Sequence, residues 1–363
     1  MKKAILIFLK INPSDHVKYK IKIGELRKLA MSCDYKIIAE IIQTRLKPTS
    51  NYLIGRGKIN ELRDMVKESN IEKLIFYNIL TSKQKYNIIS ATKCQDIIDR
   101  YDLILEIFDK MANDNLAKLQ IEKARLIKNL PLIKLNASKK LKIEHPGSMG
   151  TGEYAYKSKI RGIQSKISKI NSKIDKYKRL KESWLNKRKN LNMPIICLTG
   201  NYNAGKTTLF NLLTNSDKPV SDLPFTTLSS KYKKLSNKDY LFVDTIGFVL
   251  DIDPKLIKSF ELNLFDMINA DVILYLVDIS DELEIFKTKF LNGLNILFDI
   301  NVDYKKIIIV FNKIDSVNPN DVENKINQIT NFFPYKFPEV KISAKNSTNI
   351  EFLFEKINEV ISK

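Results

Sequence analysis

IICLTGNYNAGKTTLF, residues 195 to 210, is the stretch that decides the fold of the C-terminal half of this chain. It joins a short apolar run, a loop of the pattern GxxxxGK[ST] at 200–207, and the start of an apolar helical pattern. In such a strand–loop–helix unit, backbone N–H groups and the helix N-terminus surround phosphate groups. The stretch therefore predicts a nucleoside-triphosphate site on a parallel sheet.

The remainder of this half alternates between apolar runs and helix-length segments. Strands are expected at 195–199, 240–244, 272–278, 306–311 and 340–343, after a linker at 190–194. This rhythm predicts a doubly wound α/β P-loop domain over 191–363.

The loop and the start of its helix supply the expected phosphate contacts. The residues are Gly200, Asn201, Tyr202, Asn203, Ala204, Gly205, Lys206, Thr207 and Thr208. The Lys206 ammonium is expected to reach the β- and γ-oxygens, and the Thr207 hydroxyl to bind Mg²⁺.

Two further segments are expected to respond to the γ-phosphate. A DxxG sequence, Asp244, Thr245, Ile246 and Gly247, ends the second strand of this half. Its carboxylate would hold Mg²⁺ through water, and the Gly247 N–H would approach the γ-phosphate. Between it and the P-loop, LPFTTL at 223–228 offers Thr227, with Thr226 as reserve and Phe225 beside them, to sense the metal ion and the phosphate. The expected metal ligands are thus Thr207, Thr227 and Asp244, and the expected catalytic residues are Lys206, Thr227 and Gly247.

The base pocket is expected from two more segments. In the NKxD sequence Asn312, Lys313, Ile314 and Asp315, the Asp315 carboxylate can accept from both N1–H and the amino group of guanine, a donor pair that adenine lacks. Ser343, Ala344 and Lys345 follow the last strand, with the Ala344 N–H expected near guanine O6. The predicted substrate and product are GTP and GDP.

The N-terminal half predicts a second, smaller α/β domain at 1–108. Ile-rich strands are expected at 4–9, 36–42 and 73–77. A helix follows at 113–130, which Pro131 would end or kink, and a second runs from 154 to 188. The second carries an apolar seam spaced 3, 4, 3, 4 and 3: Ile160, Ile163, Ile167, Ile170, Ile174 and Tyr177. With a reversing loop at 145–152, these predict an antiparallel helical hairpin over 109–190.

Charge separates the two halves. Residues 1–193 contain 42 Lys and Arg against 19 Asp and Glu, a net charge of +23, whereas residues 194–363 contain 19 against 22, a net charge of −3. The faces of the second helix away from its seam are mostly basic and form a rod with Lys157, Lys159, Arg161, Lys166, Lys169, Lys173, Lys176, Lys178, Arg179 and Lys181. An ordinary solvated helix face usually carries both positive and negative side chains. We therefore favour contact with RNA phosphates over an ordinary solvated face, and also over recruitment to a membrane. For Trp184, a packing role at the base of this rod is favoured over a base-stacking platform.

Other features exclude several classes of protein. The cysteines Cys33, Cys94 and Cys197 are odd in number and lack a CxxC pair, so neither a disulfide framework nor a zinc site is expected. No apolar run approaches the roughly 20 residues that span a bilayer. The chain is expected to be cytoplasmic, and its basic half leaves room for a membrane-associated fraction.

Nearly the whole chain resembles the HflX family of GTPases. The resemblance rests on GNYNAGKTTLFN at 200–211, DTIGF at 244–248, IGRGK at 54–58, LEIF at 105–108 and KLQIE at 118–122. It implies a cytoplasmic GTPase, monomeric when free, that binds the large ribosomal subunit and ribosomal RNA. The family's GPGE-like phrase is reduced here to Gly150, Thr151, Gly152 and Glu153. Within IGRGK, a tight turn into the next helix is favoured over a second phosphate-binding turn.

The residue after DxxG is Phe248, where many GTPases carry a glutamine that orients the attacking water. A phenyl ring makes no such hydrogen bond. Slow intrinsic hydrolysis is therefore expected, raised by a partner such as the ribosome. The alternative is a nucleotide-switched RNA- or ribosome-binding module with little turnover.

Overall fold

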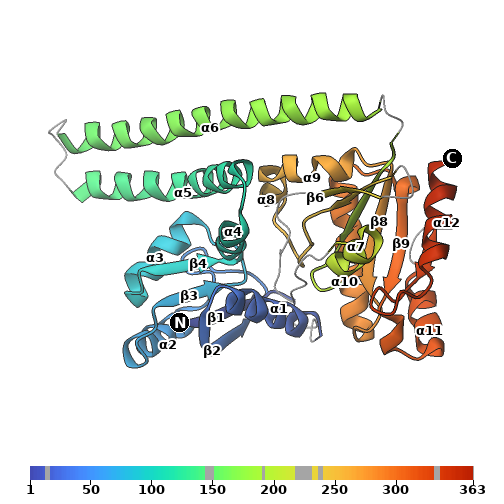
Figure 1. Cartoon of the computed structure of the whole chain (residues 1–363). Coiled ribbons are helices and arrows are strands. Elements are labelled where there is room, and N and C mark those ends of the chain that lie inside the picture. The colour runs from blue at the N-terminus through green and yellow to red at the C-terminus, as the bar shows by residue number, and fades with distance from the viewer. Residues whose placement is uncertain are drawn as a thin grey trace. The chain divides into compact units, whose positions relative to one another are not determined.

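A computed structural model of the chain describes residues 1–12, 17–143, 151–189, 193–216, 231–235, 240–330 and 336–362 (Figure 1). The chain divides into two compact units. The first contains residues 1–110 and 118–177, and the second contains residues 111–117 and 178–363.

The first unit is built on a four-stranded parallel sheet of order β2-β1-β3-β4. Its strands are β1 (Lys2–Lys10), β2 (Tyr35–Thr44), β3 (Lys73–Phe76) and β4 (Asp96–Asp99). The helices between and after them are α1 (Lys18–Ser32), α2 (Arg56–Glu68), α3 (Ser82–Thr92) and α4 (Arg100–Met111). The three predicted strands are present, whereas β4 was not predicted because its sequence DIID has an apolar run of only two residues.

The side chains of β1 alternate between two helical layers. Ile5 and Ile7 belong to a buried cluster that includes Ile59 of α2 and Ile88 of α3. On the other face, the ring of Phe8 lies 6.3 Å from that of Tyr19 in α1. Because successive side chains of a strand point to opposite faces, a continuous apolar run is buried on both sides.

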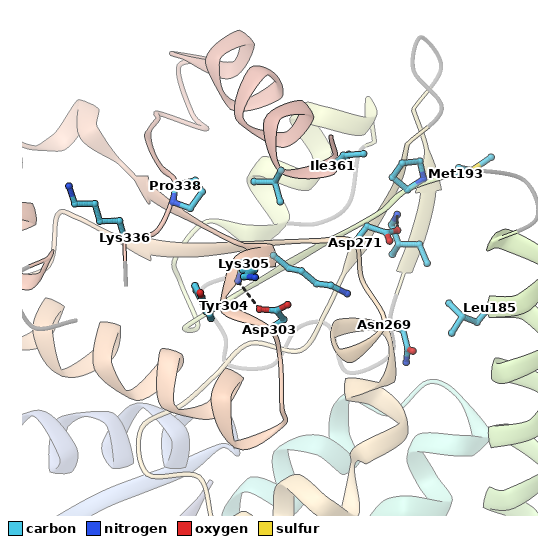
Figure 2. Close-up of a pocket in the computed structure, with 14 residues that line it drawn as sticks. Leu185, Met193, Asn269, Asp271, Asp303, Tyr304, Lys305, Lys336, Pro338 and Ile361 are labelled. Atoms are coloured by element: carbon cyan, nitrogen blue, oxygen red, sulfur yellow. Dashed lines mark hydrogen bonds between the residues drawn. The ribbon is translucent and has the colours of Figure 1, made fainter. Parts of the chain in front are cut away.

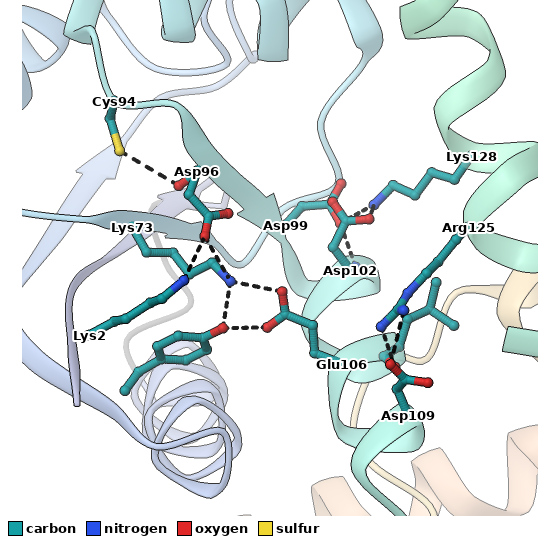
Figure 3. Close-up of polar contacts among 12 residues, drawn as sticks. Lys2, Lys73, Cys94, Asp96, Asp99, Asp102, Glu106, Asp109, Arg125 and Lys128 are labelled. Carbon is teal, nitrogen blue, oxygen red and sulfur yellow. Dashed lines mark hydrogen bonds and ion pairs between the residues drawn. The ribbon is translucent and has the colours of Figure 1, made fainter. Parts of the chain in front are cut away.

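A polar network connects this sheet to the helices that follow it (Figure 3). Lys73 is only 3% exposed, and its Nζ donates to Glu106 Oε1 at 2.8 Å and to the Tyr35 hydroxyl at 2.5 Å. Burial opposes the charge, but these hydrogen bonds and the charges of Glu106 and Asp96 outweigh it and raise the pKa of Lys73 above its ordinary value. The ammonium therefore stays protonated.

Two long helices follow, α5 (Asn115–Ile143) and α6 (Thr151–Lys189). They run side by side in Figure 1, and Lys166 of α6 forms an ion pair with Glu122 of α5. Ile170 of the predicted seam is buried, as are Ile121 and Ala124. Residues 145–150 of the expected reversing loop lie outside the described residues, and Thr151 and Gly152 already belong to α6.

Of the two outcomes expected at Pro131, an end or a kink, the helix end is wrong, because α5 continues through this residue to Ile143. A proline inside a helix removes one backbone hydrogen bond and costs about 3 kcal/mol. Packing of a helix against its neighbours outweighs such local preferences.

The second unit is built on a six-stranded sheet of order β10-β9-β8-β5-β7-β6. Its strands are β5 (Ile195–Gly200), β6 (Lys231–Lys234), β7 (Leu241–Asp244), β8 (Val272–Asp278), β9 (Ile307–Asn312) and β10 (Glu339–Lys341). All pairs are parallel except β6 with β7. The predicted doubly wound α/β fold is confirmed. The unpredicted strand is β6, whose sequence KYKK has no apolar run.

Helices cover both faces of this sheet (Figure 1). They are α7 (Lys206–Thr214), α8 (Pro254–Ser259), α9 (Glu261–Ile268), α10 (Leu283–Asp299), α11 (Pro319–Thr330) and α12 (Ile350–Ile361), with short 3₁₀ turns η1 (Tyr304–Lys306) and η2 (Ile314–Ser316). Leu209 of α7 and Leu353 of α12 share one buried cluster with the sheet. On the opposite face, the rings of Phe290 in α10 and Tyr275 in β8 lie 5.9 Å apart.

The chain order reverses around β5, which lies between β7 and β8. In open parallel sheets, ligands bind at the carboxyl ends of the strands at such a switch point. None of the helices in the described ranges is long and apolar enough to cross a membrane.

Candidate nucleotide site

The P-loop connects β5 to α7 and needs glycine at both ends. Gly200 has φ +141°, and a Cβ there would collide with the backbone carbonyl of Leu276 in β8. Gly205 has φ +89°, and a Cβ would collide with the side-chain amide of Asn312. Both positions combine a left-handed backbone with close contact, a combination that only glycine allows.

Lys206 lies beneath this loop. Its Nζ donates to the carbonyl oxygens of Gly200 at 3.0 Å and Asn201 at 2.8 Å. Burial lowers the pKa of Lys206 to about 8, although the charge of Asp244 counteracts this effect. A Cβ on Gly247 would lie 2.9 Å from the same Nζ. The structure thus brings together Lys206, Asp244 and Gly247, which the sequence places up to 41 residues apart.

The DxxG segment is attached to the P-loop through backbone hydrogen bonds. The Phe248 N–H donates to Gly200 O at 2.9 Å, and the Tyr202 N–H donates to Phe248 O at 3.0 Å. The Thr245 hydroxyl donates to Leu198 O in β5 at 2.7 Å. A displacement of either loop must therefore move the other.

Phe248 has a second role that its position in the sequence does not reveal. Its side chain is 1% exposed, so the ring belongs to the core. The sequence shows only that glutamine is missing here; the structure shows a side chain directed away from solvent.

Two of the three expected metal ligands lie in the described residues. Asp244 ends β7 and is fully buried, and Thr207 lies in the first turn of α7. A carboxylate and a hydroxyl are hard oxygen donors of the kind that Mg²⁺ prefers, so the residues fit this ion. Thr227, with Thr226 and Phe225, lies outside the described residues.

Asn312 joins three of the predicted segments. Its Nδ2 donates to Ala204 O of the P-loop at 2.9 Å, and its Oδ1 accepts from the Ala344 N–H at 3.0 Å. The Ala344 N–H, expected near guanine O6, is thus bonded to Asn312 in this structure. Asn312 is buried and holds both loops at the end of β9.

The Asp315 carboxylate is exposed and positioned by a hydroxyl. Ser343 Oγ donates to Asp315 Oδ1 at 2.6 Å, and this hydrogen bond lowers the pKa of Asp315. The group is therefore ionised at neutral pH and offers acceptors for donors of a base. Lys345, expected beside it, is exposed.

Asp278 is a residue that sequence reasoning missed. It ends β8, is 7% exposed, and its Oδ2 accepts from Lys313 Nζ at 2.6 Å. Its other oxygen accepts from the N–H and hydroxyl of Ser280. The sequence contained one signal for this role, the single aspartate that ends the apolar run VILYLVD. A carboxylate at the end of a buried strand needs a hydrogen-bonding or charged partner.

The other P-loop positions are accounted for in the structure. Asn201 Nδ2 donates to Lys289 O at 2.9 Å, and Lys289 Nζ lies 5.8 Å from the centre of the Tyr202 ring. Asn203 has φ +61°, Ile246 is buried and Thr208 is partly exposed.

The segment 54–58 of the first unit leads into α2. Gly55 is the N-cap of this helix, and its N–H donates to Gln43 Oε1 at 2.7 Å, as in the favoured tight turn.

A hollow of about 900 Å³ lies elsewhere in the second unit (Figure 2). Among its lining residues, Asp271, Lys306 and Pro338 immediately precede β8, β9 and β10. It therefore lies at the amino ends of the strands, opposite the edge that carries the P-loop. This hollow is distinct from the nucleotide site.

Comparison with known proteins relates each part of the chain to GTPases. Residues 20–109 match a family model described as GTP-binding GTPase N-terminal, residues 111–188 match the GTP-binding GTPase middle region, and residues 195–313 match 50S ribosome-binding GTPase.

Curated relatives match most of the chain. The GTPase HflX of Thermococcus kodakarensis is 33% identical over 347 residues, which cover 94% of this chain and 78% of the relative. That of Thermofilum pendens is 33% identical over 370 residues, covering 94% and 85%. The chain belongs to the HflX family of GTPases. This HflX chain is accordingly a GTP-binding, GTP-hydrolysing enzyme.

A solved structure supports the fold over the full length of this HflX chain. The structure of SsGBP in complex with GDP is 26% identical, has a TM-score of 0.55, and covers 100% of this chain and 99% of its own. The GDP bound to SsGBP agrees with guanine-nucleotide binding by the HflX chain.

Proposed function

We propose that this HflX GTPase hydrolyses GTP slowly on its own and faster on the ribosome, with its basic N-terminal half in contact with ribosomal RNA of the large subunit. The proposal rests on the hydrogen bonds and close contacts that connect the P-loop with the DxxG and NKxD segments. Lys206, Phe248 and Asn312 make these contacts. They support a site in which the three segments respond together to the bound nucleotide.

In this proposal, each side chain of the site has a role. Lys206 leaves the carbonyls of Gly200 and Asn201 to bind β- and γ-oxygens, and the Gly247 N–H meets the γ-phosphate. Thr207, Asp244 and Thr227 hold Mg²⁺, which when bound neutralises phosphate charge. Asp315 accepts from guanine, while Asn312, Lys313 and Ser343 keep the base pocket in place, with Ala344 and Lys345 at its edge.

Slow intrinsic turnover follows from Phe248. Its ring is buried and carries no hydrogen-bonding group, so it cannot orient water. A partner that arranges the γ-phosphate loops or contributes a polar group would accelerate the reaction.

The ribosome is proposed as this partner on two grounds. The model matched by residues 195–313 is described as 50S ribosome-binding GTPase. The predicted basic rod on α6 is accessible to solvent, with nine of its ten cations exposed and Lys181 half-buried. Such a surface suits an RNA backbone, whose contacts release counterions and weaken with salt. Cytoplasmic localisation and a monomeric free state belong to the same proposal.

GTP turnover by the purified full chain, alone and with 70S ribosomes or separate large subunits, tests it. Strong stimulation that Lys206→Ala abolishes is expected. A chain that binds GTP and ribosomes but turns over equally slowly with both would instead be a nucleotide-switched binding module.

A further inference from the structure

A large aromatic side chain lies open on α6. Trp184, the only tryptophan of the sequence, is 61% exposed, and Leu180, one helical turn earlier, is 60% exposed. Trp184 is therefore not enclosed in a core, and most of its surface is accessible to solvent. Adjacent large apolar side chains exposed to water are characteristic of interaction sites.

The surface around Trp184 is cationic. Lys173, Lys176, Leu180, Trp184 and Lys187 recur at intervals of 3, 4, 4 and 3 residues, which places them on one face of the helix. All five are exposed.

The carboxylates of this part of α6 lie elsewhere. Asp175 and Glu182 are nine and two positions from Trp184, about 160–180° around a helix of 3.6 residues per turn. Lys181, three positions and about 60° from Trp184, is used internally, because its Nζ bonds to Asp266 and to Leu262 O of α9. Among the described residues of α6 after Ile170, the face of Trp184 thus combines an aromatic surface with positively charged side chains.

We infer that Trp184, with Leu180 and Lys187, forms a platform on which an unpaired base of single-stranded RNA stacks. The inference rests on the proposed RNA contact of the basic half and assigns a position to it. An indole offers a flat surface to any base, and Lys187, one turn after Trp184, and Lys176, about two turns before it, attract the flanking phosphates.

The chemistry of this face favours RNA over a lipid surface. A helix that lies in a membrane interface presents a broad apolar face of many residues. Here two apolar side chains are enclosed by lysines within one turn along the helix. The charge complements a polyanion, and the narrow apolar patch matches one or two bases.

Because Trp184 is the sole tryptophan, its fluorescence reports on this position alone. The full chain is titrated with a mixed-sequence 12-nucleotide single-stranded RNA, with inorganic polyphosphate and with anionic phospholipid vesicles. RNA is expected to quench the emission, whereas polyphosphate, which has no base to stack, leaves it unchanged. Unchanged emission at saturating RNA, or a blue shift on vesicles without quenching by RNA, would overturn the inference.

Variants separate stacking from charge. Trp184→Ala should weaken RNA binding about 5- to 150-fold, which is one base–aromatic stack of ~1–3 kcal/mol converted at 1.4 kcal/mol per tenfold. Trp184→Phe should retain most of the affinity. Lys187→Ala should lose more affinity than Lys178→Ala, a matched charge change on another face. Equal binding by Trp184→Ala and wild type contradicts the platform.

Failure of this inference is distinguishable from failure of the proposed function. If ribosomes stimulate Trp184→Ala and wild type equally and RNA binding is unaltered, the platform is absent while the ribosome-coupled GTPase stands. If ribosomes stimulate neither protein but RNA quenches Trp184 and Trp184→Ala binds it weakly, the platform stands without that function.

Discussion

Lys181 of α6 donates to the Asp266 carboxylate of α9 at 2.9 Å. The second oxygen of Asp266 accepts from the Tyr232 hydroxyl of β6 at 2.6 Å. The chain reaches α9 shortly after DxxG, and Tyr232 closely follows the segment that contains Thr226 and Thr227. One buried carboxylate therefore links the basic helix to elements next to both segments expected to respond to the γ-phosphate.

Asp266→Asn should weaken this link. Because the amide keeps the shape but not the charge, we expect ribosome-stimulated turnover to fall about 5-fold or more, the lower end of typical coupling between sites. Unstimulated hydrolysis and GDP affinity should stay near wild type, since Asp266 touches no P-loop residue in any described contact. Lys356→Ala, which breaks the ion pair with Glu359 within α12 and lies outside the basic half, is the control. Full stimulation of Asp266→Asn would disprove the coupling.

GDP binding should depend on pH through Lys206. Above its pKa of about 8, the free protein loses this proton, whereas bound phosphates restore it. Affinity should then fall by up to about tenfold per pH unit above pH 8, with uptake of one proton. Calorimetry in two buffers of different ionisation enthalpy measures the uptake. In Lys206→Ala the proton uptake on GDP binding should vanish. An unchanged number of protons taken up would mean that another group titrates.

The free energy of unfolding should also depend on pH through Lys206. It should rise with pH, whereas the affinity for GDP falls. The folded-state pKa of Lys206 is about 8 against an ordinary value of 10.5. The unfolded chain therefore binds more protons between these values, and this group raises the free energy of unfolding as pH increases through that window. Urea unfolding of wild type and Lys206→Ala at pH 8 and pH 9.5 compares the slopes.

Asp315→Asn should reduce affinity for GDP by about 100-fold, because two hydrogen bonds to a charged acceptor are lost or weakened. The Asn amide can donate to a carbonyl at C2, so xanthosine diphosphate should gain affinity relative to GDP. Competition binding with GDP, xanthosine diphosphate and ADP measures the change. Asp321→Asn, the same change at an exposed carboxylate in the first turn of α11, serves as the control, and unaltered selectivity would exclude Asp315 from base recognition.

The sequence was sufficient for the fold class and for most strands of both sheets, because apolar periodicity and strand-end motifs are local. It failed at β6, whose lysines pair only through β7, and at Pro131, where packing overrides a local preference. The roles of Asp278 and Phe248 are tertiary: Asp278 matters because Lys313 lies against it, and Phe248 because its backbone joins two loops. Exposure of Trp184 likewise depends on which face of α6 is covered.

Glu106→Gln should destabilise the first unit by about 1–3 kcal/mol. The charge of Glu106 that balances buried Lys73 is removed, and among the described residues Asp96, 3.3 Å away, is the remaining ion-pair partner. Urea unfolding followed by circular dichroism measures the loss. Replacing both partners, Lys73→Met with Glu106→Leu, should recover much of it, since an apolar pair leaves no buried charge unpaired. A double variant less stable than Glu106→Gln would show that the pair is favourable in itself.

Phe248→Gln should not accelerate intrinsic hydrolysis. A glutamine at this position would restore the residue that many GTPases use, but the side chain is 1% exposed and points into the core. The substitution buries an amide where a ring packed, at a cost of about 3–5 kcal/mol. Single-turnover GTP hydrolysis without ribosomes, together with urea unfolding, measures both effects. Phe248→Leu should keep the basal rate with a smaller loss of stability, because the backbone bonds to Gly200 and Tyr202 do not depend on the side chain. Faster basal hydrolysis in Phe248→Gln would mean that the side chain at 248 reaches the attacking water, and that its replacement by phenylalanine is itself what slows the enzyme.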